Sequence, residues 1–195
     1  MTAQVPDGFV LDGEELSLVG VNGSPLFHPF DHGMLPTAVH TACWRGFIAT
    51  YGVRDGRLVV TKVVTRLMDG VNGEHTVESA PALFGVRPVV DEKLAALRYD
   101  DLDGPVPFTG GLLLGAGFIG GLYVHMGFHP AWKYERVLEV LAESGNVTAV
   151  HDRSDAMAVV RDEILAGKRP EPDGRAEASA RLERMFSLDY DRSGA

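Results

Sequence analysis

Three cationic side chains and one tyrosine fall on two segments that the sequence predicts to pair as a β-hairpin. The segments are residues 44–53 and 58–67, joined by the turn Asp55-Gly56, which is a strong hairpin signal. Like charges on a mostly apolar face need carboxylates or a bound anion to compensate them. The pattern therefore predicts either ion pairs or a pocket that binds a small organic ligand, anions included. The candidate ligand-binding residues are Arg45, Tyr51, Lys62 and Arg66.

A two-residue turn at Asp55-Gly56 determines which residues lie opposite one another. Residues that face each other share one side of the sheet, so the pairing places the three cations on the same side as the apolar residues. A bulge would shift the pairing by one residue and exchange the faces on one strand. The predicted pairs are Arg54–Arg57, Val53–Leu58, Tyr51–Val60, Ala49–Lys62, Phe47–Val64 and Arg45–Arg66.

A proline-rich segment, residues 23–43, concentrates side chains of the types that bind zinc or iron. The candidate metal ligands are His28, His32 and His40, with His125 from a later segment. No paired-cysteine or HExxH spacing accompanies them, and such residues also satisfy backbone groups in irregular segments. The last residue of this segment, Cys43, is expected to be a small buried residue rather than a nucleophile.

Three glycines in the run LLLGAGFIGG match the pattern of a dinucleotide-binding loop, namely Gly115, Gly117 and Gly120. The residues that follow are poor helix formers and lead into Pro130, and no repeated strand–helix–strand pattern precedes them. We therefore expect glycines that relieve crowding in packed strands. No cofactor is predicted; NAD is not expected, and zinc or iron remains the alternative.

Composition narrows the choice of partners. The formal net charge of −9 disfavours nucleic acid, because affinity for it depends on neutralising phosphates. Residues 106–128 are apolar enough to be checked as a membrane span, but seven glycines and a histidine argue against one. A single cysteine and an N-terminus without signal-peptide features predict a cytoplasmic protein.

The elements expected to position these residues are mostly strands. We predict a mainly β (β-rich α+β) fold, a strongly curved antiparallel sheet or barrel with short helices and a C-terminal helical arm. Besides the central hairpin, the predicted strands are a hairpin at 9–20 about Asp12-Gly13, a strand at 83–90, and two glycine-rich strands within 108–128 that meet near Gly120-Gly121. Residues 133–142 fit either a helix or a strand, and a hairpin with 147–150 is favoured.

Helical signals are fewer and lie mostly toward the C-terminus. The predicted helices are 92–99 with Asp91 as N-cap, 156–166 capped by Ser154 or Asp155, and 176–188. The predicted organisation is a β-rich domain at 1–167, a linker at 168–175, and a C-terminal helix with a disordered tail at 176–195.

The stretch WRGFIATYGVRDGRLVV, residues 44–60, resembles a pattern found in uncharacterised bacterial β-rich proteins. In these proteins a Trp-Arg-Gly-aromatic strand leads through an acidic-Gly turn into a returning strand. The resemblance implies a β-rich fold and carries no activity or site residue with it.

Three function classes remain. The favoured one is non-enzymatic binding of a small organic ligand in a barrel-like pocket. The second is a metal-dependent enzyme that uses the histidines, and the third is an interaction module that forms homodimers through the C-terminal arm or an exposed strand edge.

Overall fold

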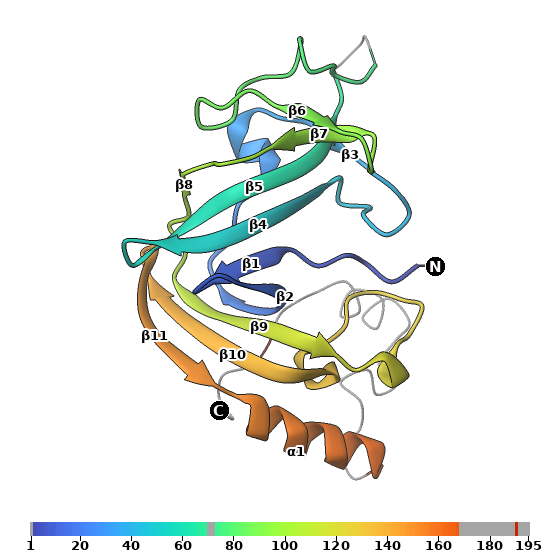
Figure 1. Cartoon of the computed structure of the whole chain (residues 1–195), viewed down its shortest axis with the longest axis vertical. Coiled ribbons are helices and arrows are strands. Elements are labelled where there is room, and N and C mark those ends of the chain that lie inside the picture. Colours follow the sequence, from blue (N-terminus) through green and yellow to red (C-terminus); the bar gives the residue numbers. More distant parts are fainter. Residues whose placement is uncertain (1, 70–72, 168–189, 191–195) are drawn as a thin grey trace.

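The computed structural model describes residues 2–69, 73–167 and 190, which form one mainly β structure with a single sheet of 11 strands curved in a ring (Figure 1). The fold class expected from the sequence is therefore confirmed. The strands are β1 (Gly8–Leu11), β2 (Glu14–Gly23), β3 (Pro36–Thr37), β4 (Phe47–Arg54), β5 (Arg57–Leu67), β6 (Val89–Asp91), β7 (Ala96–Tyr99), β8 (Gly104–Pro105), β9 (Gly110–Phe118), β10 (Tyr134–Glu143) and β11 (Asn146–Asp152). The helical elements are η1 (Pro29–His32), η2 (Gly120–Leu122), η3 (Ala131–Lys133) and α1 (Ser154–Leu165).

The ring follows the strand order β11-β10-β9-β2-β1-β4-β5, and β7 and β6 extend the sheet beyond β5. Neighbouring strands are antiparallel except β1 and β4, which run parallel. Asn146 of β11 pairs with Arg57 of β5 where two hairpin turns meet. There the amide of Leu58 donates to Gly145 O at 2.8 Å, and that of Val147 donates to Gly56 O at 2.8 Å. The two hairpins thus bring the first and last strands of this order together.

Tight turns with both central residues at positive φ produce the predicted hairpins. They are Asp12-Gly13, Asp55-Gly56 and Ser144-Gly145, with φ from 49° to 82°. Glycine adopts this conformation without strain, and aspartate and serine precede it in these turns. The hairpins at 9–20 and 44–67 are confirmed, and residues 133–142 are strand, as favoured.

The predicted register of the central hairpin is correct near the turn and wrong beyond it. Val53 pairs with Leu58 and Tyr51 with Val60, but Thr50 then pairs with Lys62 because Thr61 is an additional residue on β5. This β-bulge exchanges the faces of β5 from Lys62 onward.

The bulge separates the predicted cations and changes which residues fill the core. Val63 and Leu67 now face the interior, whereas Val64 packs outside with Val39 and Cys43. The exchange places the larger apolar set of β5 inside, which is a physical reason for the bulge. The predicted pairs Ala49–Lys62, Phe47–Val64 and Arg45–Arg66 are therefore wrong.

Three further local predictions are wrong. Only Val89 and Val90 of the strand predicted at 83–90 belong to a strand, β6. Residues 92–99 are not a helix, because residues 92–95 form a turn between β6 and β7, with Ala95 at φ 47°. Asp91 still caps this turn by accepting hydrogen bonds from the amides of Lys93 and Leu94. Residues 108–128 contain one strand of the main sheet, β9, followed by η2 and irregular chain.

The helix predicted at 156–166 is confirmed as α1, but neither predicted residue caps it. Arg153 occupies the N-cap position without a side-chain cap hydrogen bond. The Ser154 hydroxyl accepts from the Val137 amide instead, which attaches the helix to β10. No helix among the described residues is long and apolar enough to cross a membrane. The predicted linker at 168–175 and helix at 176–188 lie outside the described residues.

Side chains fill the interior of the ring. Buried residues from most of the strands form one continuous cluster that includes Phe9, Tyr51, Tyr99, Phe108 and Leu114. A second, smaller cluster lies on the outer face of β2, β9 and β10, where η3 and α1 cover it (Figure 1). The sheet therefore has buried side chains on both faces, and each face holds a buried carboxylate.

Candidate functional site

The strongest candidate site is built around a buried carboxylate, Asp7, immediately before β1. Its two oxygens accept from both terminal nitrogens of Arg45, at 3.0 Å and 2.5 Å, and Oδ1 also accepts from the Ala49 amide at 2.6 Å. The parallel pairing of β1 with β4 makes this possible, because it aligns Gly8 with Thr50 and brings Asp7 next to Ala49. The side chain of Asp7 is only 5% exposed, so the arginine offsets a charge that would otherwise be very costly to bury.

Tyr51 of β4 lies close enough to this pair to interact with both charges. Its hydroxyl is buried, and the main-chain amide of Phe27 approaches the oxygen as a donor, but no acceptor for the O–H lies within hydrogen-bond distance among the described residues. Burial raises the pKa of Tyr51 well above its usual range, the Asp7 charge adds to the shift, and Arg45 opposes it. The tyrosine therefore stays protonated and offers a buried O–H donor. Buried polar groups without a partner are rare and mark places where a water or ligand group can bind.

Cys43 belongs to the same region. Its thiol is buried and donates to Phe47 O at 3.3 Å. Burial is the largest influence on the thiol and raises its pKa, and Arg45 partly opposes the shift. The thiolate is the nucleophilic form, so this environment supports the expectation of a buried, unreactive cysteine.

Aromatic and histidine rings cover this end of the ring. Phe47 contacts the Arg45 guanidinium, with 4.9 Å from Cζ to the ring centroid, and also the rings of His28 and Phe27. His28 stacks on Phe30 at 5.0 Å. The structure therefore brings together two of the predicted ligand-binding residues, Arg45 and Tyr51. His28, which was predicted as a metal ligand, lies beside them and makes aromatic contacts instead.

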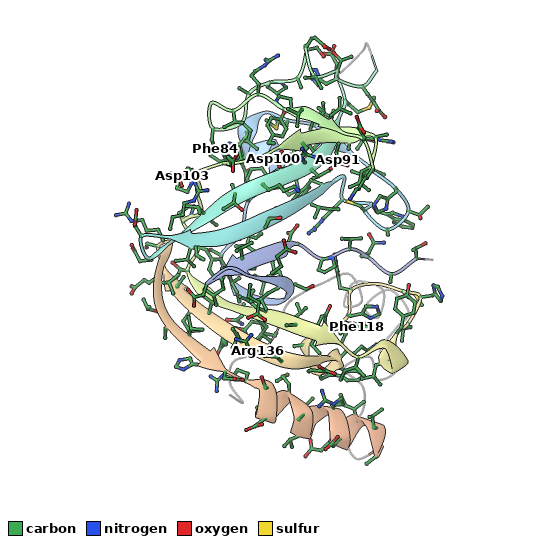
Figure 2. All side chains as sticks on the ribbon, in the orientation of Figure 1. Phe84, Asp91, Asp100, Asp103, Phe118 and Arg136 are labelled. Carbon is green, nitrogen blue, oxygen red and sulfur yellow. The ribbon has the colours of Figure 1, made fainter. Side chains whose placement is uncertain are left out.

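His32 and Phe84 complete this cover. The His32 ring stacks on Phe27 at 5.1 Å and meets the Phe84 ring at 4.8 Å. Phe84 has a φ of 49°, and its ring lies against Gly104, where a Cβ would approach to 2.2 Å. Phe30 and Phe84 are 57% and 37% exposed, and Figure 2 shows Phe84 on the part of the molecule that carries β5 to β8. An apolar surface therefore adjoins the polar cluster.

The other two predicted ligand-binding residues lie elsewhere. Lys62 faces outward and pairs with Asp100 at 3.9 Å. Arg66 donates to the carbonyl oxygens of Ala95 and Leu94 and lines a separate surface hollow of about 340 Å³ with Glu74. The prediction that these cations converge with Arg45 is wrong, because the bulge at Thr61 turns them to the outer face; any separate binding role stays a prediction.

The remaining predicted metal ligands are dispersed. His40 accepts from the Ala42 amide in the loop before β4, and His125 lies near the Tyr123 hydroxyl at 3.5 Å. Within residues 2–69, 73–167 and 190, no three His, Cys, Asp or Glu side chains gather closely enough to hold a metal ion.

Two glycines of the run LLLGAGFIGG, Gly115 and Gly117, have a packing role. A Cβ at Gly115 would lie 2.7 Å from the Tyr134 ring, and one at Gly117 would lie 2.8 Å from Glu135. Gly120 begins η2, a three-residue 3-10 turn rather than an α-helix. These glycines let β9 approach the side chains of β10, as the alternative interpretation of the motif expected.

A second group of buried, unpartnered atoms lies at the far end of β9. Both ring nitrogens of His129 and Nε1 of Trp132 have no hydrogen-bond partner among the described residues. The His129 ring packs on Phe118 at 4.7 Å, and burial lowers its pKa. This group lacks the carboxylate–arginine pair of the first cluster, so its histidine is best explained as a neutral packing ring.

Sequence reasoning missed Asp7, the central residue of the site. The sequence carries no local signal for it, because the parallel pairing of β1 with β4 depends on the whole topology. Phe27 and Phe47 were likewise identifiable only as apolar residues. Comparison of the chain with protein-family models, with curated proteins and with solved structures finds no match. The site itself is thus the basis for a functional proposal.

Proposed function

We propose that the protein binds a small organic ligand without catalysing a reaction, at the cluster of Asp7, Arg45 and Tyr51. The observation that carries this proposal is the buried O–H of Tyr51, which has no acceptor within hydrogen-bond distance among the described residues. Leaving such a donor unpaired costs about 1–3 kcal/mol. A ligand oxygen that accepts from Tyr51 would recover that energy, and its apolar body would lie toward the exposed rings of Phe30 and Phe84.

The charge of the site determines the kind of ligand. The anion pocket expected from the sequence required three cations, but Arg45 is already neutralised by Asp7. We therefore propose a ligand with an uncharged acceptor, such as a carbonyl group, next to an aromatic or aliphatic body. An organic anion would have to compete with the Asp7 carboxylate for the Arg45 guanidinium. We therefore expect it to bind no more tightly than an uncharged ligand of the same shape.

Saturation-transfer NMR with benzamide and benzoate tests this proposal, because the two probes share a ring and differ in charge. We expect benzamide to bind at least as well as benzoate, and Tyr51→Phe to weaken benzamide binding about tenfold, the value of one neutral hydrogen bond. Tyr123→Phe is the matched control, since that exposed hydroxyl lies outside the cluster. Equal binding by wild type and Tyr51→Phe would refute the proposal.

A metal-dependent enzyme has less support, because the rings of His28 and His32 are engaged in aromatic contacts. The proposal includes a cytoplasmic location.

A second candidate is an interaction module that pairs through β6. This strand ends the sheet order, and its residues Val89 and Val90 are among the exposed large apolar residues. Exposed apolar edges favour strand addition by another chain. Light scattering of wild type and Val90→Lys tests this candidate: a dimer that the substitution abolishes would support it, and a monomeric wild type would exclude it.

A further inference from the structure

The outer face of the sheet contains a second buried carboxylate, Glu139, in the middle of β10. Its side chain is 1% exposed. Arg153 donates to its Oε2 through two nitrogens, at 2.9 Å and 2.7 Å, and the Tyr190 hydroxyl donates to its Oε1 at 2.8 Å. Two neighbours from different segments thus stabilise one buried charge.

Tyr190 is held by its main chain as well as its side chain. Its amide donates to Val21 O at 3.2 Å, and the side-chain amide of Asn22 donates to Tyr190 O at 2.7 Å. Tyr190 therefore forms hydrogen bonds through three polar groups: its N–H, its C=O and its hydroxyl.

Gly20 leaves the space that the tyrosine ring occupies. A Cβ at this position would lie 3.0 Å from Tyr190 Cδ1 and 2.9 Å from Leu113 Cδ1. The ring also packs with the outer apolar cluster, which includes Val19 and Val137. The result is a socket with an apolar floor and a carboxylate that accepts from the phenol. We call it the tyrosine socket and define it by Gly20, Asn22, Leu113, Glu139 and Arg153.

We propose that the tyrosine socket is a binding site for a tyrosine residue in a peptide segment, occupied by Tyr190 of the same chain. The socket fits tyrosine better than phenylalanine, because without the phenol the buried Oε1 loses a donor. It lies on the opposite face of the sheet from the cluster of Asp7, Arg45 and Tyr51, and does not depend on the function proposed for that cluster. It holds Tyr190 against the sheet and releases it when a competing tyrosine segment binds.

Binding of a labelled peptide of residues 186–195, FSLDYDRSGA, tests the proposal by fluorescence polarisation. We expect the peptide to bind the full-length Tyr190→Ala variant at least tenfold more tightly than wild type, because the attached tyrosine competes at high effective concentration. A peptide with phenylalanine in place of the tyrosine should bind the variant at least fivefold more weakly. Equal affinity for variant and wild type, or for the two peptides, would overturn the proposal.

NMR of the ¹⁵N-labelled wild type gives a measurement that does not depend on the variant folding. Excess unlabelled peptide should shift the Tyr190 amide signal, because Tyr190 leaves, whereas the Asn22 side-chain signal should change little because the peptide replaces the same acceptor. No shift of the Tyr190 amide at saturating peptide would contradict a displaceable occupant. A dimer that forms in wild type and disappears in Tyr190→Ala would overturn the assignment of Tyr190 to its own chain.

Discussion

Two clusters of similar composition, each with a buried carboxylate, an arginine and a tyrosine, lie on opposite faces of this sheet, and they differ in whether the tyrosine hydroxyl donates to the carboxylate. The inner cluster contains Asp7, Arg45 and Tyr51, and the outer cluster contains Glu139, Arg153 and Tyr190. In both, an arginine donates twice to a buried carboxylate. In the outer cluster the tyrosine hydroxyl also donates to the carboxylate, whereas in the inner cluster the tyrosine O–H has no acceptor among the described residues.

This difference means that the outer cluster has its tyrosine O–H paired, whereas the inner cluster has its tyrosine O–H unpaired. The outer cluster satisfies its buried tyrosine hydroxyl, so it functions as an attachment. The inner cluster retains a buried donor, which is a feature of sites that bind something else. The comparison teaches that two carboxylate–arginine–tyrosine clusters have different roles according to whether the tyrosine O–H has an acceptor.

Removal of the inner arginine should have the largest effect. Arg45→Met leaves the Asp7 carboxylate buried without its counter-charge, and we expect the free energy of unfolding to fall by about 3 kcal/mol. Urea denaturation measures this change. Arg136→Met is the matched control, because Arg136 pairs with Glu14 at an exposed position (Figure 2) and should change stability little. A similar decrease in the free energy of unfolding of both variants would show that the buried Asp7–Arg45 pair contributes no more to stability than an exposed ion pair.

Filling the floor of the outer cluster should have the next largest effect. Gly20→Ala puts a methyl group against Tyr190 and Leu113 and should lower the free energy of unfolding by about 1–2 kcal/mol. Gly120→Ala serves as the control, since nothing lies within 4 Å of a Cβ there. Thermal and urea denaturation compare the two variants, and a Gly20→Ala protein as stable as Gly120→Ala would contradict the tight contact with Tyr190.

The two tyrosines should respond to the same substitution with opposite signs. Tyr51→Phe removes an unpaired buried hydroxyl and should stabilise the protein by about 1 kcal/mol, whereas Tyr190→Phe removes a hydrogen bond to a carboxylate and should destabilise it by about as much. Differential scanning calorimetry gives both changes. A destabilised Tyr51→Phe protein would mean that the inner hydroxyl has a partner, and the contrast between the clusters would fail.

The smallest effect is a pH dependence of the inner cluster. Burial raises the pKa of Asp7, although Arg45 opposes the shift, so the folded protein binds a proton at this carboxyl more readily than the unfolded chain. The resulting stabilisation is present at low pH and is lost as the pH rises from 3.8 through the folded-state pKa. The stability of wild type minus that of Asp7→Asn should therefore decrease between pH 4 and pH 7 in urea titrations. If the difference in stability between wild type and Asp7→Asn increased with pH instead, the pKa of Asp7 would be lowered by folding and not raised.

Much of the fold could be predicted because it depends on short-range chemistry. The pairs Asp12-Gly13, Asp55-Gly56 and Ser144-Gly145 identify three hairpins, since few residues other than glycine enter their turns without strain. The strand at 133–142 was harder, because leucine and glutamate spacing also fits a helix; the turn that follows decides for a strand. Residues 92–99 show the limit of such short-range prediction. Asp91 does cap the residues that follow it, as expected, but these residues form a single turn and not a helix.

The candidate site could be predicted only in part. Arg45 and Tyr51 were identified because the predicted hairpin pairing placed both on the same, mostly apolar face of the sheet. Lys62 and Arg66 were placed with them by a register that one additional residue, Thr61, interrupts. No pattern in the sequence marks Asp7, whereas Glu139 is an acidic residue in the middle of an apolar strand and could have been singled out.

The amino-acid sequence by itself determined the hairpins, the mainly β class and the residues capable of buried polar chemistry, because turn geometry and strand alternation act within a few residues. Only the tertiary structure decided which of these residues meet. Asp7 reaches Arg45 through the parallel pairing of β1 with β4, and Tyr190 reaches Glu139 across the outer face. Both contacts bring together groups that are 38 and 51 positions apart, and such contacts depend on how the whole sheet packs.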